Sequence, residues 1–401
     1  MNSLYYWAIG ALALYVAART LVILKRHIVL AAAASVFMAA AGLAHPFLMA
    51  AGLTRPWEGT MHTVLLVSGF AFTFSVFFAL LLLIRDIVWL AAKLISLLRR
   101  RFRRRFELSL REPRDWNTPI YSALALLALV GTVIGTWEAQ RAPLLREVEI
   151  TLPRLPQALD GIRIVQLTDL HMSPLFSHER SAEIFKRAAA LSPDFFVVTG
   201  DLADGTPEAR KKDAELFARL PKTAPVFMIP GNHDYYVDFA GWKAFYEKAG
   251  VPLLVNAHET LTLRGLPVTI AGLADRTGEA KGFPGPDIEK ALAGAAPDAL
   301  RIVLMHRPEN PDPQADPKHG VDLQLSGHTH AAQLFFMRPF VSLQNHGNVY
   351  GLYKCREMPL YVGSGTGLWS GTPARLLAQP EIVVITLRSA AGNDAAGKAT
   401  N

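Results

Sequence analysis

One stretch decides the fold: IRIVQLTDLH, residues 162–171. Its first six positions are mostly apolar and β-branched, which is typical of a short buried strand. Asp169 and His171 follow at once, and their i, i+2 spacing places both side chains on one side of an extended chain. The stretch therefore predicts a strand that delivers two metal-ligating side chains to one cavity.

Four later strand-like runs end in the same way. Open α/β sheets place their ligand crevice at the carboxyl ends of the strands, so we expect all five runs to supply one site. The runs alternate with segments of helical pattern, at about 179–191, 207–220, 239–249 and 287–293, which indicates sheets covered by helices. The four runs are Phe195–Val198 before Asp201, Val226–Ile229 before Asn232, His233 and Asp234, Ile302–Met305 before His306, and Val321–Leu325 before His328 and His330.

The residue types predict the chemistry. Three Asp or Asn groups and four imidazoles exceed the needs of one divalent ion, but they suit two ions that share a carboxylate. Oxygen and nitrogen ligands without thiolate favour Mn, Fe or Zn over copper(I) or iron–sulfur clusters. The alternative is turn formation and capping, to which Asp and Asn are also suited. On that interpretation His306 is an ordinary strand-end histidine and Asp234 caps the next turn.

Taken together, Asp-x-His, Gly-Asp, Gly-Asn-His-Asp, a lone His and Gly-His-Thr-His resemble the calcineurin-like metallophosphoesterase superfamily. The resemblance covers about Ile162–Leu387. Gly231–Tyr236, Gln333, and Arg375 with Pro380-Glu381-Ile382 are similar to the bacterial YkuE/YaeI-like phosphodiesterase branch. That branch usually has two glycines before the glutamine, where this chain has Ala331 and Ala332, so substrate specificity stays open. The implied fold is an α+β sandwich of two mixed sheets flanked by helices.

The resemblance also implies a role for each site residue. His233 would act on the phosphoryl group, with Asp234 orienting it, while a metal-activated hydroxide attacks phosphorus. The cofactors would be two divalent metal ions per chain. One ion would be held by Asp169, His171, Asp201 and His330, and the other by Asp201, Asn232, His306 and His328.

The first third of the chain has a different character. Four stretches approach the roughly 20 apolar residues that a membrane-spanning helix needs. Arg19 near the end of the first would reach the interface, and an amphipathic stretch, 86–98, follows the third. We expect a helical membrane domain, residues 1–140, with both of its ends facing away from the cytoplasm. The predicted spans are 4–24, 28–53, 61–84 and 119–137.

Charge sets that orientation. The whole chain carries a formal charge of +7, but residues 1–137 hold 14 Lys and Arg against 5 Asp and Glu. The basic residues cluster between spans one and two and in the loop 85–114, and such clusters mark the cytoplasmic side. The run 99–105 therefore indicates topology and lipid contact rather than nucleic-acid binding. We expect a multi-pass protein of the plasma (inner) membrane of a bacterium, with an extracytoplasmic (periplasmic) catalytic domain.

The rest of the chain is expected to comprise a linker at 141–160, a catalytic domain at 161–389 and a disordered tail at 390–401. The single cysteine, Cys355, excludes an intramolecular disulfide. Tyr235, Tyr236 and Trp369 are candidates for an apolar lip where a lipid or lipid-linked headgroup enters.

The leading hypothesis is a membrane-anchored, metal-dependent phosphodiesterase acting on a phosphoester substrate. One alternative is a UDP-diacylglucosamine-type pyrophosphatase, which would need a cytoplasmic site. Another is a non-catalytic metal-binding membrane scaffold. It is disfavoured because catalytically dead relatives typically lose metal ligands, whereas every ligand position is filled in this chain. A transporter is disfavoured because no acidic residue falls inside the predicted spans.

Overall fold

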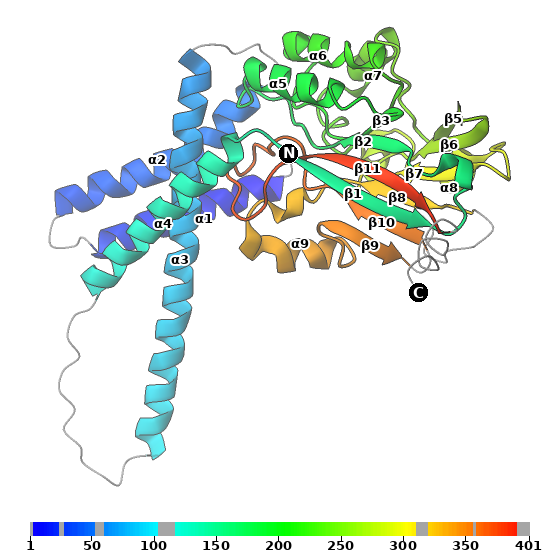
Figure 1. The fold of residues 1–401 in the computed structure, drawn as a ribbon. Coiled ribbons are helices and arrows are strands. Elements are labelled where there is room, and N and C mark those ends of the chain that lie inside the picture. Colours follow the sequence, from blue (N-terminus) through cyan, green and yellow to red (C-terminus); the bar gives the residue numbers. More distant parts are fainter. Residues whose placement is uncertain are drawn as a thin grey trace. The chain divides into compact units, whose positions relative to one another are not determined.

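The computed structural model describes residues 3–23, 28–52, 60–102, 117–309, 320–355 and 358–390. The chain divides into two compact units (Figure 1). The first comprises Met1–Ala50 and Thr63–Trp137, and the second comprises Ala51–His62 and Glu138–Asn401.

The first unit is helical. Its elements are α1 (Ser3–Ile23), α2 (Ile28–Gly52), α3 (Thr60–Phe102) and α4 (Asn117–Gln140). By length and composition, the described segments contain three helices that could cross a membrane: Ile28–Gly52, His62–Arg99 and Pro119–Gln140. The first predicted span is also helical, but its described apolar part, Gly10–Val22, is shorter than a full span.

Helix α3 is longer than predicted, because the third span and the amphipathic stretch after it form one helix of 43 residues. Asp86 therefore lies within a candidate span instead of bordering one. Its carboxylate pairs with Arg19 of α1 and accepts a hydrogen bond from the Tyr15 hydroxyl at 2.7 Å. A charge inside a membrane is costly unless it is paired, which explains why Arg19 meets Asp86. Of the predicted basic loop, residues 103–114 lie outside the described residues.

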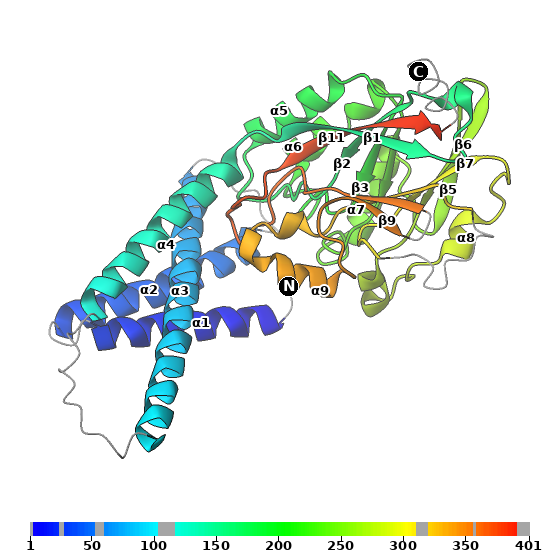
Figure 2. The same ribbon diagram turned by 60° about the horizontal axis from the view of Figure 1, so that its bottom comes forward.

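The second unit contains two mixed β-sheets (Figure 2). The first sheet has the order β1-β11-β2-β3-β4. Its strands β2, β3 and β4 are parallel, so their carboxyl ends lie at one edge. The bounds are β1 (Leu144–Leu152), β2 (Arg163–Leu167), β3 (Phe195–Thr199), β4 (Val226–Ile229) and β11 (Glu381–Ser389).

The second sheet has the order β5-β6-β7-β8-β10-β9, and its strands β6, β7, β8 and β10 are parallel. The main core contains side chains of both sheets, among them Val197 and Ile229 of the first and Ile270 and Leu304 of the second. The bounds are β5 (Ala257–Leu263), β6 (Leu266–Gly272), β7 (Leu300–Leu304), β8 (Leu323–Ser326), β9 (Gly351–Cys355) and β10 (Met358–Val362).

Helices flank the sheets. Phe185 of α5, Phe217 of α6 and Tyr246 of α7 form a chain of ring contacts with centroids 5.9 Å apart. Helix α8 packs on β5 and β6. The bounds are α5 (His178–Ala189), α6 (Lys211–Phe217), α7 (Phe239–Lys248), α8 (Ile288–Leu292) and α9 (Arg338–Gln344).

The structure differs from the sequence predictions in the linker and in three further elements. The predicted linker 141–160 is wrong, because it contains β1, which pairs with β11 in parallel over nine residues. Strands β5 and β9 and helix α9 were not predicted. Most of the predicted disordered tail, 391–401, lies outside the described residues.

Candidate metal centre

All seven predicted metal ligands lie at the carboxyl ends of strands. Asp169 and His171 follow β2, Asp201 follows β3, Asn232 follows β4, His306 follows β7, and His328 and His330 follow β8. Five of them have positive φ, a backbone conformation that non-glycine residues adopt only when the surrounding structure imposes it. These are Asp169 (51°), His171 (47°), Asp201 (52°), His328 (70°) and His330 (51°). The chain therefore turns sharply at the positions of these ligands.

One group of ligand atoms gathers around Asp169. Nε2 of His330 lies 3.4 Å from Oδ1 of Asp169 and 3.0 Å from Nε2 of His171. The same His171 nitrogen lies 3.6 Å from Oδ2 of Asp201. Two imidazole nitrogens and two carboxylate oxygens therefore converge, as the coordination of one divalent ion requires.

A second group gathers around His306. Its Nε2 lies 3.3 Å from Oδ2 of Asp201 and 3.1 Å from Oδ1 of Asn232. Nδ1 of His328 lies 3.3 Å from that same nitrogen. Because Oδ2 of Asp201 faces both groups, this residue has the geometry of a shared, bridging ligand.

The donor set fits a divalent metal. Asp169, His171, Asp201 and His306 are at most 2% exposed, and buried carboxylates and imidazoles at such density are normally paired or bind a metal. Within the described residues, three overlapping clusters have ligand atoms within 4.8 Å of one another. This geometry is more than turn formation and capping demand.

Neighbouring groups fix the orientation of the rings. Nδ1 of His306 donates to the Thr199 carbonyl at 2.8 Å, which leaves Nε2 to face the ligand cluster. Nδ1 of His171 lies 3.2 Å from Oδ1 of Asp204. Such second contacts select the tautomer and hold the ring in place. Arg375 is fully buried and donates to the carbonyls of Ser364 and Gly367, the loop that borders His330.

Neighbouring carboxylates favour the charged form of one ring in each ligand group, His171 in the first and His306 in the second. Burial acts to lower the pKa of His171, but the carboxylates of Asp204 and Asp201 outweigh it and raise that pKa to about 9. The pKa of His306 is raised to about 10 because Asp201 likewise outweighs burial. Burial and a neighbouring cation, Arg307, hold the pKa of His328 well below its usual value.

The predicted catalytic residue His233 follows β4, and its ring shares one of the three clusters with His171 and Asp201. Its Nδ1 is 2.6 Å from Oδ1 of Asp204, and its backbone NH donates to Asp201 at 2.8 Å. Sequence reasoning missed Asp204. The available signal was the spacing in Gly200–Asp204, where a second acid follows Asp201 by three residues.

Asp234 has a different position from the one predicted. Its Oδ2 accepts backbone NH bonds from Gly231 at 2.7 Å and from Asp201 at 3.0 Å. Burial, followed by the nearby Asp201 charge, raises the pKa of Asp234 to about 7. Asp234 therefore secures the turns that carry Asn232 and Asp201, and Asp204 is the carboxylate against His233.

The predicted apolar lip is only partly accessible. Tyr235 is 4% exposed and stacks on Phe239 at 4.2 Å, so it belongs to the protein interior. Tyr236 is half-buried, and its hydroxyl accepts a hydrogen bond from Asn232 at 3.1 Å. Trp369 is half-buried too, and its backbone NH donates to Gln333. Tyr236 and Trp369 remain candidates for substrate contact, but Tyr235 is too buried.

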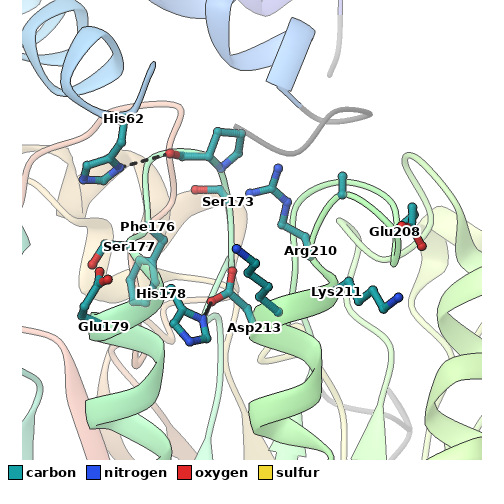
Figure 3. Close-up of a pocket in the computed structure, with 13 residues that line it drawn as sticks. His62, Ser173, Phe176, Ser177, His178, Glu179, Glu208, Arg210, Lys211 and Asp213 are labelled. Atoms are coloured by element: carbon teal, nitrogen blue, oxygen red, sulfur yellow. Dashed lines mark hydrogen bonds and ion pairs between the residues drawn. The ribbon is translucent and has the colours of Figure 1, made fainter. Parts of the chain in front are cut away.

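A separate pocket of about 630 Å³ is lined mainly by residues at the N-terminal ends of α5 and α6 (Figure 3). Its lining includes His62 and Ser173, which is two residues after His171, but none of the seven ligands. His178 and Asp213 point toward one another at 3.2 Å, and Arg210 also lines the pocket (Figure 3). The pocket therefore adjoins the cluster but is not part of it.

Comparison with known proteins agrees with this geometry. The family model of calcineurin-like phosphoesterases matches residues 162–332. The metallophosphoesterase YkuE of Bacillus subtilis is 33% identical over 244 residues, which cover 59% of this chain and 82% of that protein. A metallophosphoesterase of Helicobacter pylori is 33% identical over 265 residues, 65% of this chain and 68% of that protein. The chain belongs to the calcineurin-like metallophosphoesterase family.

Membership extends to relatives with membrane segments. A "transmembrane protein with metallophosphoesterase domain" of Danio rerio is 32% identical over 272 residues, 66% of this chain. The match spans 62% of that protein's own length. Family membership implies a hydrolase of phosphoric esters that uses divalent metal ions, and the clusters at Asp169 and His306 are where this metallophosphoesterase would hold them.

Proposed function

We propose that this metallophosphoesterase is a membrane-anchored phosphodiesterase with two divalent ions, Mn, Fe or Zn, in each chain. One observation carries the proposal: two ligand groups share Oδ2 of Asp201. The proposed substrates are phosphodiesters, including lipid or lipid-linked headgroups. Nucleic acid is not among the proposed partners, because the basic residues are concentrated in the membrane third.

The ligand arrangement supports two ions better than one. Asp169, His171 and His330 form one group of ligand atoms, and Asp201, His306 and His328 form another, with Asn232 next to His306. When bound, two divalent ions acidify water and neutralise charge on phosphoryl oxygens. The protein's task is then to position substrate and to move protons.

His233 is the group placed to move a proton. It is 15% exposed at the side chain, so it can meet substrate, and its Nδ1 is held by Asp204. That contact leaves Nε2 for the leaving oxygen of the ester. A histidine so oriented can act as the general acid, or stabilise the charge that develops on the phosphoryl group.

A turnover panel tests the proposal. Full-length protein would be stripped of metal and then assayed with Mn, Zn or Mg added back, on bis-p-nitrophenyl phosphate, a monoester, a nucleotide-sugar lipid and phospholipids. We expect hydrolysis of the diester, two metals per active chain by elemental analysis, and loss of activity with chelator. Full activity with one bound metal, or hydrolysis of the monoester alone, would contradict the proposal.

The proposed topology is four spans in the plasma membrane, with the catalytic unit outside the cytoplasm. Its support is the distribution of Lys and Arg: of the 14 within residues 1–137, all but Arg55 fall on the proposed inner side. A reporter active only outside the cytoplasm, fused after Trp137, should be active. If only a cytoplasmic reporter works there, the orientation is inverted, and a cytoplasmic pyrophosphatase acting on a nucleotide-linked acylated sugar becomes the better hypothesis.

A further inference from the structure

An exposed apolar surface begins five residues after the candidate ligand His330. No residue of η6 (Phe335–Met337) or α9 is buried, so this segment adds nothing to the core. We call the surface the Phe340 face. It consists of Phe335 (44% exposed), Phe336 (38%), Phe340 (54%), Leu343 (85%) and Leu377 (69%).

Two hydrogen bonds to backbone carbonyls hold the Phe340 face in place. The NH of Phe335 donates to the Leu376 carbonyl at 3.0 Å, and the Arg338 guanidinium donates to the Leu377 carbonyl at 2.9 Å. Leu377 has a φ of +56°, which is unfavourable for a leucine. The structure thus maintains an unfavourable backbone conformation at an apolar side chain that remains exposed.

The face is connected directly to the metal centre. From His330 to Phe335 the chain can extend by at most about 18 Å. Within that interval Gln333 is 3% exposed, and its side-chain amide donates to the carbonyl of Thr372 at 2.6 Å. A molecule bound at the Phe340 face is therefore close to the ligand cluster.

A lipid bilayer is the partner that fits this face. The described part of the same chain includes three helices long and apolar enough to cross a membrane. The last of them, α4, ends at Gln140, and β1 of the catalytic unit begins at Leu144. Three intervening residues keep the catalytic unit next to any membrane in which α4 is embedded.

The charges around the face agree with a membrane surface. Residues 331–344 include no Asp or Glu and contain Arg338, whose guanidinium contacts Leu377. Aromatic and leucine side chains beside basic residues are the composition of segments that lie in the bilayer interface, where anionic headgroups attract the cations. An exposed apolar patch of this kind typically marks an interaction site.

We propose that the Phe340 face inserts into the surface of the bilayer and brings the metal centre to phosphodiesters of membrane lipids. Insertion is inferred from the exposed apolar side chains of the Phe340 face, whereas the choice of substrate rests on the proposed phosphodiesterase function. The two parts are tested separately.

Insertion is tested by spin labelling of the full-length protein in nanodiscs of phosphatidylethanolamine and phosphatidylglycerol. Replacing Cys355 by Ser removes the only cysteine, and Leu343→Cys then carries the label. We expect the label at position 343 to be more accessible to oxygen, which dissolves in the bilayer, than to a nickel complex that stays in water. A label at the exposed Glu259 of β5 is the aqueous control. Nickel accessibility at 343 equal to that at 259 would overturn insertion, and so would shielding from both reagents together with a dimeric mass.

Substrate access is tested with the double variant Phe340→Ser, Leu343→Ser. Turnover of phospholipid in the nanodisc should fall by at least about tenfold, because two apolar side chains no longer anchor the face. Turnover of soluble bis-p-nitrophenyl phosphate should stay unchanged. The apolar swap Phe340→Leu, Leu343→Phe should restore phospholipid turnover. Equal loss on both substrates would overturn the access role. A wild-type protein inactive on both would refute the proposed function, and the labelling would still decide insertion.

Discussion

Oδ1 of Asp204 lies 2.6 Å from Nδ1 of His233, and the same oxygen lies 3.2 Å from Nδ1 of His171. One carboxylate therefore contacts both a candidate metal ligand and the candidate proton donor. Burial acts to raise the pKa of Asp204, but the two imidazoles outweigh it and hold that pKa well below its usual value. Asp204 thus stays ionised and couples the orientation of two rings that belong to different strands.

Replacing Asp204 should affect catalysis more than folding. In Asp204→Asn the amide keeps the shape but loses the charge, so His233 is no longer held as an effective acid. We expect kcat to fall by about 10²–10⁴, measured on a soluble diester. Asp213→Asn is the matched control, because Asp213 is also buried and paired with a histidine, His178, but touches none of the seven ligands. Equal losses in the two variants would contradict the role of Asp204.

His233→Asn should separate proton transfer from metal binding. Its metal content should remain that of the wild type, while kcat falls by about 10²–10⁴. The loss should be smaller for esters with good leaving groups, since these need little protonation. Elemental analysis together with a leaving-group series measures both effects. Loss of metal in this variant would place His233 among the ligands.

Asp201→Asn should give the opposite pattern. Oδ2 of Asp201 faces both ligand groups, at 3.6 Å from His171 and 3.3 Å from His306. Removing its charge should lower the metal content and abolish turnover together. Metal titration and turnover are measured on the same preparation, and a variant that keeps its metals and normal activity would refute the bridging assignment.

Metal binding should strengthen as pH rises. In metal-free protein the rings of His171 and His306, with pKa values raised to about 9 and about 10, are charged at neutral pH. Metal binds the neutral ring, so each ring releases a proton, and affinity should rise by up to about tenfold per ring and pH unit. Calorimetric titrations with Mn or Zn at several pH values measure the slope, and a flat profile would contradict the charged rings.

The same two rings predict the stability of metal-free protein. A raised histidine pKa stabilises the fold below the unfolded value of about 6.5. That stabilisation is lost as pH rises through about 9 and about 10. The difference in Tm between metal-loaded and metal-free protein should therefore widen as pH rises from neutral to about 9. His306→Ala should show a weaker dependence.

The ligand set could be predicted from sequence because strand ends mark it. β2, β3 and β4 are short apolar runs, and each is followed within three residues by Asp, Asn or His. Parallel strands bring those ends to one edge, so alternation and order along the chain suffice to predict the site. The carboxyl partner of His233 was assigned incorrectly because neighbours in sequence, such as Asp234, need not be neighbours in space.

Elements with mixed burial could not be predicted in this way. β1 alternates charged and apolar residues at the edge of its sheet and follows a membrane helix, so its sequence resembles a linker. The α9 segment lacks a buried side and therefore lacks the periodic pattern by which a helix is recognised. The prediction that Tyr235 belongs to an exposed lip is wrong, because its position in a turn does not reveal that Phe239 and Phe283 pack against it.

The pairing of β1 with β11 bears on how the protein is made. β11 lies between β1 and β2, yet among the described strands it leaves the ribosome last. Until it arrives, the edges of β1 and β2 that it will occupy have no partner, and unpaired edges invite association with other chains. The membrane helices can insert early in synthesis, whereas the catalytic sheet can close only after its final strand is delivered. We therefore expect the helices of the first unit to form before the sheet of the second unit is complete.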